Sequence, residues 1–359
     1  MRALDRWLLP YLRQTAVKSG TPMKHVFLAI ADHFEPFHQT DRNGALERMR
    51  RWRDEYPKAV ADFRDSAGRG PRHSFFYPVE QYDEQVVEHV AALCRETGGE
   101  AEVHLHHEND TEATLRPKLS EGARRLMEHG LLSRHSDGRP AFAFVHGDWA
   151  LANSGHGGRC CGVPDEIRIL LEEGCYADLT FPSAPDPSQP RRINSLYYIK
   201  NTGSPAALDT GPAVSAGRPG PAGHLLMIQG VLALNWRRRK FGLLPRLENS
   251  DVTQRNPPTA DRFQLWLRRA PRVRGREDWA FVKLHSHGAT PANSGVFLGP
   301  PMRDFHSYLC DEWAKERDHV LHYVTAREMA NVIHAVEAGA TGFVPSMLDF
   351  RYPRPASAL

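Results

Sequence analysis

The chain has 359 residues, of which 41% are hydrophobic and 25% are charged, a balance typical of a folded globular protein that excludes a disordered one. The 46 Lys and Arg residues exceed the 43 Asp and Glu residues by three, which argues against the concentrated positive charge of a nucleic-acid-binding protein. No apolar run approaches the ~20 residues of a membrane-spanning helix, so we expect a soluble chain without a transmembrane segment.

The cysteines and the amino-terminal residues bear on the cellular compartment. Five cysteines are an odd number, and a chain this long can bury a large core without disulfides, so a reducing compartment is favoured. The first ten residues carry charges where the apolar core of a secretory signal would lie, and we therefore expect a cytoplasmic protein. Apolar residues from Leu4 to Leu12 recur at helical spacing, which predicts a helix within residues 1–20. Such a helix packs on its own domain or makes a weak contact with a membrane surface.

From residue 24 onward, apolar segments of strand length alternate with longer amphipathic segments, the pattern of parallel strands joined by helices. Strands are predicted at residues 25–31, 74–77, 102–106, 141–145, 176–181 and 278–284, with one strand or a strand pair at 225–234. Helices are predicted at residues 45–63, 82–97, 115–129, 164–173, 259–269, 304–318 and 325–339. Residues 201–223 are rich in Gly, Pro, Ser and Ala and predict a long surface loop. We interpret residues 1–359 as a single domain of the α/β class.

Three of the predicted strands end in side chains of the types that ligate metal ions. They are Asp32 and His33 after the first strand, His104, His106 and Asp110 around the end of the third, and His285 and His287 after the last. The carboxyl ends of parallel strands converge on one face of a barrel, where side chains distant in sequence can surround one ion or substrate. The recurrence therefore predicts a metal site at that face.

His104 and His106 supply the core of the expected ligand set. They point to the same side of a strand, and Asp110 can return towards them across a short loop. Two imidazoles and one carboxylate leave one position of a tetrahedral ion open to water, so we expect a divalent metal cofactor, zinc. We interpret the next two residues, His107 and Glu108, as exposed or as supporting the ligands.

The order of these clusters resembles the polysaccharide deacetylase family, metal-dependent esterases that remove acetyl groups from carbohydrates. Residues 30–34, Ile-Ala-Asp-His-Phe, are similar to the family motif Thr-Phe-Asp-Asp-Gly, and residues 106–110, His-His-Glu-Asn-Asp, are similar to His-(Ser/Thr)-x-x-His. Residues 282–285, Val-Lys-Leu-His, resemble the motif Leu-x-x-His-Asp. The resemblance extends over residues 26–289 and implies a deformed (β/α) barrel with long loops.

The same resemblance implies roles for the residues of the first two motifs. Asp32 would be the catalytic base, and His33, His106 and Asp110 would be metal ligands, with His104 beside them. This set has the family's ligand types in a permuted order. An alternative alignment makes Asp32 a ligand.

The remaining site residues follow from the later motifs. His285 would be the general acid that protonates the leaving group, with His287 as the alternative. Residues from 146 to 154 are loosely similar to the motif that lines the family's substrate groove, although its Arg and Pro are absent. His146, Asp148 and Trp149 would bind substrate there, and Trp149 offers the flat apolar surface on which a sugar ring can lie.

These expectations describe a metal-dependent hydrolase that removes acetyl groups from a carbohydrate, polysaccharide precursor or glycoconjugate. One alternative is an amidohydrolase that acts on small C–N substrates on the same kind of barrel. A second alternative is a catalytically silent carbohydrate-binding or assembly protein.

For several other polar segments the sequence favours a structural role over a functional one. The basic run at residues 237–240 is interpreted as a solvated turn. Cys160 and Cys161 lie in a glycine-rich loop and are interpreted as packing residues. We assign no role to Glu248 or Asp251.

Overall fold

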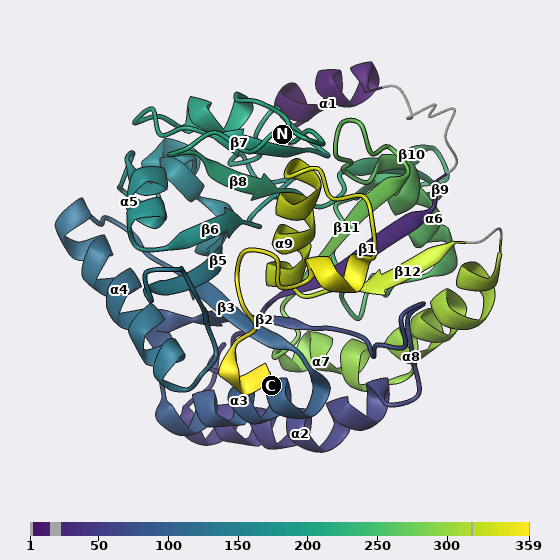
Figure 1. Cartoon of the computed structure of the whole chain (residues 1–359), viewed down its shortest axis with the longest axis horizontal. Helices are drawn as coiled ribbons and strands as arrows, with labels where there is room; N and C mark the ends of the chain where they lie inside the picture. The colour runs from purple at the N-terminus through teal and green to yellow at the C-terminus, as the bar shows by residue number, and fades with distance from the viewer. Residues whose placement is uncertain (1–2, 15–22, 317–318, 359) are drawn as a thin grey trace.

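The computed structural model describes residues 3–14, 23–316 and 319–358, and its centre is a largely parallel β-sheet flanked by helices (Figure 1). The strands are β1 (His25–His33), β2 (Ser74–Pro78), β3 (Glu100–Leu105), β4 (Ser133–Arg134), β5 (Pro140–His146), β6 (Cys175–Asp178), β7 (Leu196–Ile199), β8 (Leu225–Ile228), β9 (Ala233–Lys240), β10 (Leu244–Glu248), β11 (Trp279–Ser286) and β12 (Val320–Tyr323). The strand order is β11-β1-β2-β3-β5-β6-β8-β7, with β12 beside β1 and β4 beside β5. Only β7 and β4 run antiparallel to their neighbours in this sheet. The predicted α/β class is confirmed.

The helices follow the strands in the expected alternation. They are α1 (Leu4–Arg13), α2 (Arg42–Val60), α3 (Glu84–Thr97), α4 (Glu112–Glu128), α5 (Glu166–Glu172), α6 (Ala260–Arg269), α7 (Pro291–Leu298), α8 (Pro300–Ser307) and α9 (Ala326–Glu337). Local capping fixes several ends: the Asp83 side chain accepts a hydrogen bond from the Val86 N–H at the start of α3. The same helix ends at Gly98, whose φ of 66° suits glycine and whose N–H bonds the Cys94 carbonyl.

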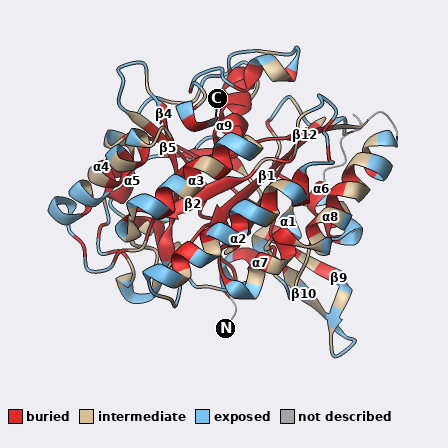
Figure 2. Ribbon diagram, turned by 90° about the horizontal axis from the view of Figure 1, so that it is seen from below, coloured by how far each residue is buried: buried red, intermediate tan, exposed pale blue. Residues whose placement is uncertain are grey.

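The two faces of the sheet are covered by different helices. Along β1, Val26 and Leu28 pack in the core shared with α2 and α3, whereas Phe27 and Ala29 pack in the core shared with α9. Every residue of α9 is buried, and Figure 1 shows this helix in front of the middle of the sheet. In Figure 2 the outer helices bury the sides that face the sheet and expose the opposite sides. A sheet covered on both faces leaves the ends of its strands as the places where polar side chains can gather.

Three predicted features differ from the structure. The basic run at 237–240 is part of β9, which pairs with β10 in a separate hairpin, so its interpretation as a turn is wrong. The helix predicted at 304–318 begins earlier, as α8, and passes into a short π-helical segment at Tyr308–Glu312. Within residues 201–223, a short 3-10 helix at Pro205–Asp209 interrupts the predicted loop.

The amino-terminal helix predicted within residues 1–20 is α1, and residues 1–2 and 15–22 lie outside the described part of the chain. Its Trp7 and Tyr11 are buried, and the Arg269 guanidinium of α6 lies 4.5 Å from the centre of the Tyr11 ring. Across the described ranges, none of the helices combines the length and the apolar character needed to cross a membrane.

A buried ion pair ties α9 to the start of β3. Arg327 donates to both carboxylate oxygens of Glu100, at 2.7 and 3.0 Å, and both side chains are 1% exposed. We expect Arg327→Met to lower the free energy of unfolding by ~3–5 kcal/mol, because it leaves the Glu100 charge buried without its partner. Urea denaturation measures this loss. Arg124→Met removes the exposed ion pairs of Arg124 on α4 and should change stability little, and an equal loss in both variants would contradict the argument.

Candidate metal centre

Four imidazoles and one carboxylate meet at the ends of β1, β3 and β11. Glu35 lies two residues beyond β1, and its Oε1 is 3.3 Å from His104 Nε2, 3.5 Å from His106 Nε2 and 3.8 Å from His287 Nε2. The His33 ring lies on the same side, with its centre 4.7 Å from that of His287 and 5.0 Å from that of His104. We call His33, Glu35, His104, His106 and His287 the histidine cluster.

The second ring nitrogen of two of these histidines is already bonded. His104 Nδ1 lies 2.7 Å from the Val145 carbonyl, and His106 Nδ1 lies 2.8 Å from Glu80 Oε1. Because these partners only accept hydrogen bonds, each Nδ1 carries a proton and donates, and each Nε2 faces the Glu35 carboxylate. Metal-binding histidines show this arrangement, in which an outer carbonyl or carboxylate fixes the tautomer.

The electrostatics of the cluster favour an ionised Glu35 carboxylate between a neutral His33 and a positively charged His106. Burial lowers the pKa of His33 well below its ordinary value, and neighbouring histidines lower it further. Burial alone would raise the pKa of Glu35, but its contacts with His104 and His106 hold that pKa well below its usual range. Burial opposes a charge on His106 too, yet the Glu35 and Glu80 carboxylates raise its pKa to about 10, so a cation is favoured where these groups meet. Nitrogen and oxygen donors of this kind suit zinc or a similar divalent ion.

Asp32 lies beside the histidine cluster and faces the other side of β1. Its Oδ2 is 2.9 Å from His73 Nε2, and its Oδ1 accepts a 2.6 Å hydrogen bond from the Gly288 N–H. Successive side chains of a strand point to opposite sides, which separates Asp32 from His33. A Cβ at position 288 would lie 2.3 Å from Asp32 Oδ2, so the turn that follows His287 approaches this carboxylate as only glycine allows.

Asp110, which the sequence predicted as a ligand with His106, lies outside the histidine cluster. Its Oδ2 is 3.1 Å from His107 Nδ1 and 2.7 Å from Lys118 Nζ. His107 is buried, so the interpretation that would expose it is wrong, whereas Glu108 is exposed as expected. β3 ends at Leu105, and the next two residues turn to different sides: His106 faces Glu35 and His107 faces Glu166.

The predicted substrate-binding residues have different environments. His146 ends β5 and is fully buried, with its ring centre 4.6 Å from that of His107, so it does not line an open groove. Asp148 is exposed and Trp149 is half-buried on the turn that follows. That turn touches the histidine cluster, because a Cβ at Gly147 would lie 2.4 Å from His106 Cδ2.

The last two predicted residues sit on β11 and the turn after it. His285 is buried behind the cluster, with its ring centre 6.2 Å from that of His33, and burial lowers its pKa well below the ordinary value. His287 is the more accessible of the two, since 34% of its side chain is exposed. Of these two histidines, His287 is therefore the one that combines contact with Glu35 and access to solvent.

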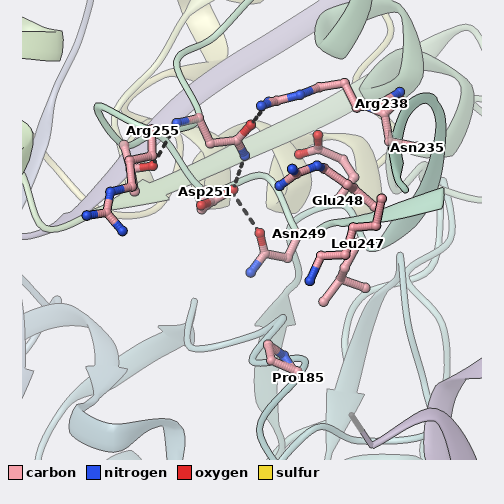
Figure 3. A pocket seen from close by; sticks show the side chains of 12 residues that line it. Pro185, Asn235, Arg238, Leu247, Glu248, Asn249, Asp251 and Arg255 are labelled. Atoms are coloured by element: carbon pink, nitrogen blue, oxygen red, sulfur yellow. Dashed lines mark hydrogen bonds between the residues drawn. The ribbon is translucent and has the colours of Figure 1, made fainter. Parts of the chain in front are cut away.

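A polar pocket of about 370 Å³ lies beside β11, where the backbone of Asp251 pairs with that of His285. Figure 3 shows Arg238, Asp251 and Asn249 at this pocket. Asn256 accepts a hydrogen bond from Arg238 and donates one to Asp251, whose backbone N–H donates to Asn249. The cationic residues that line the pocket are Arg238, Lys240, Arg246 and Arg255. The sequence assigned no role to these residues, because nothing in it shows that β9, β10 and the segment after β10 surround one space.

Sequence reasoning also missed Glu35 and Glu80. The signal for Glu35 was its position two residues after His33, in the same polar segment at the end of the first strand. Glu80 offered no comparable signal, because a glutamate after a strand is most often exposed.

No family model matches the chain, and no match to a curated protein was found.

We expect His106→Ala to lower the bound divalent metal by one ion per chain, because a site with three protein ligands cannot lose one of them and hold its ion. Elemental analysis of purified protein measures this loss. His224→Ala is the matched control, since His224 lies on a loop and bonds only the nearby Ala222 carbonyl. Wild-type metal content in His106→Ala would contradict the ligand assignment.

Proposed function

We propose that the chain is a metal-dependent hydrolase that removes acetyl groups from a carbohydrate or polysaccharide precursor. The observation that carries the proposal is that Glu35, His104 and His106 each offer one donor atom, all within 4.8 Å of one another. Two imidazoles and one carboxylate are the expected ligand types, with Glu35 in place of Asp110. The resemblance to polysaccharide deacetylases supports the deformed (β/α) barrel as the finer description of the fold.

The ligand set is open on one side. His104 is fully buried, whereas 34% of the His106 side chain is exposed, so solvent reaches the set past His106. A bound divalent ion supplies Lewis acidity, which lowers the pKa of water towards ~7 and polarises an acyl carbonyl. Three protein ligands with one open side are typical of catalytic sites, whereas four protein ligands are typical of structural sites.

His287 is the residue that moves a proton in this proposal. Burial lowers its pKa, so the ring is neutral at pH 7 and its nitrogen can accept a proton from water. The protonated ring then donates that proton to the leaving alkoxide or amine of the sugar. His285 is buried behind His33 and lacks access to a leaving group, so we assign the general acid to His287.

Asp32 and His73 act on His287 through the backbone. The Asp32 carboxylate receives the Gly288 N–H and holds the turn on which His287 lies. His73 is fully buried, 2.9 Å from that carboxylate, and fixes its orientation. We therefore treat Asp32 as a positioning residue.

Two features support a carbohydrate as the substrate. Trp149 is half-buried on the turn that contacts His106, at a place where a sugar ring can stack against it. The pocket beside His285 is lined mostly by polar and charged side chains, which suits a hydroxylated ligand better than an apolar one.

Acetate release from N- and O-acetylated glycans tests the proposal. We expect the zinc-loaded chain to release acetate, to lose this activity after chelation and to regain it with added zinc. His106→Ala should be inactive, and His224→Ala should match the wild type. Hydrolysis of small amides without acetate release would favour an amidohydrolase, and inactivity of the loaded chain on both panels would favour a binding protein.

We expect Asp32→Asn to keep its metal and to lower kcat by about 10–100-fold, the usual effect of losing a residue that positions a catalytic group. The substitution leaves the ligands in place but weakens the hold on the Gly288 turn. Steady-state kinetics with elemental analysis measures both effects. Loss of the ion together with activity would instead identify Asp32 as a ligand.

A further inference from the structure

A second group of metal-binding side chains lies on the other side of the chain segment that contains His106. His107, His146, Cys161 and Glu166 each offer one donor atom, all within 4.8 Å of one another, and all four residues are buried. We call them the buried cluster. His107 Nε2 and His146 Nε2 lie 3.1 and 3.3 Å from Glu166 Oε1. Cys161 Sγ lies 3.5 Å from the other oxygen of that carboxylate.

The outer nitrogens of both imidazoles face acceptors. His107 Nδ1 is 3.1 Å from Asp110 Oδ2, and His146 Nδ1 bonds the Gly147 carbonyl. His107 Nε2 donates a hydrogen bond to Glu166 Oε1, whereas His107 Nδ1 is buried without a hydrogen-bond partner in the part of the chain that the structure describes. Within the described residues, His146 Nε2 has no hydrogen-bond partner although its side chain is fully buried. Buried ring nitrogens without partners beside a buried carboxylate are unfavourable, and a cation among these side chains would remove that cost.

We propose that the buried cluster is a structural zinc site with His107, His146, Cys161 and Glu166 as its four ligands. Four protein ligands complete a tetrahedral shell and leave no position for water or substrate, as in structural zinc sites. One thiolate and one carboxylate balance the two charges of the ion, which suits complete burial. The thiolate selects zinc over magnesium or calcium, which prefer oxygen ligands.

The position of the site explains what it would stabilise. Residues 147–163 form an irregular loop of short 3-10 turns, with Asp148, Trp149, Ala152 and Cys160 at positive φ. The buried cluster joins the end of this loop to the segment after β3 and to α5. The join is close, because a Cβ at Gly162 would lie 2.7 Å from the Asp110 carbonyl oxygen.

The inference is independent of the proposed hydrolase, because the two clusters share no residue. The histidine cluster contains no cysteine, so a thiolate–metal bond reports on the buried cluster alone. Cobalt(II) is a suitable probe, since it takes the place of zinc and its bond to a thiolate gives an intense charge-transfer absorption in the near ultraviolet.

The test is to strip the full chain of metal, reload it with cobalt(II), and record its absorption and metal content. We expect two ions per chain and a thiolate-to-cobalt band in the wild type. Cys161→Ser should lose the band and one ion. Cys160→Ser is the matched control, since it changes the adjacent cysteine, which lies outside the cluster, and it should keep both. His106→Ala should lose one ion and keep the band.

Three results would overturn the proposal. They are a wild-type chain without the thiolate band, a Cys161→Ser chain that keeps it, and a Cys160→Ser chain that loses it. The wild-type spectrum decides the matter even if Cys161→Ser fails to fold. A wild-type chain that binds one ion and shows the band would instead count against the hydrolase alone.

Discussion

The structure of the site depends on the register between β3 and β5. This pairing sets His104 opposite Val145, whose carbonyl then accepts a hydrogen bond from His104 Nδ1 and turns Nε2 towards Glu35. A shift of one residue would turn His104 to the other face of the sheet and remove it from the histidine cluster. The register is held by the core on both faces, since Val103 and Leu105 pack under the outer helices while Val145 packs towards α9.

Adjacent side chains that turn to opposite sides explain why one run of polar residues supplies two clusters. His106 and His107 are adjacent, yet His106 turns towards Glu35 and His107 towards Glu166. At the end of β1 the same rule separates Asp32, which faces His73, from His33. Proximity in sequence therefore identified the correct segments but could not assign each side chain to a side.

The sequence predicted most of the strands and helices, because their apolar periodicity reflects burial against the sheet. It missed β4, β7, β10 and β12, each of five residues or fewer, and the eight-residue helix α7, because such short segments show little apolar periodicity. It found the histidines at the strand ends but missed Glu35 and Glu166. These glutamates are ligand candidates because they are buried, and the burial of a single polar residue leaves no pattern in the sequence around it. Glu166 is 59 positions from His107, and only the packing of α5 beside the end of β3 brings the two together.

The two clusters differ in their access to solvent, which distinguishes catalytic from structural metal sites. The histidine cluster has half-exposed members, His106 and His287, whereas every member of the buried cluster is shielded from water. Gly147 lies between them, against the His106 ring on one side and bonded to His146 on the other. A loop anchored by the buried cluster would thus form one wall of the open cluster and hold Trp149 beside it. The closed buried cluster would then make this loop rigid and keep the residues beside the open histidine cluster in place.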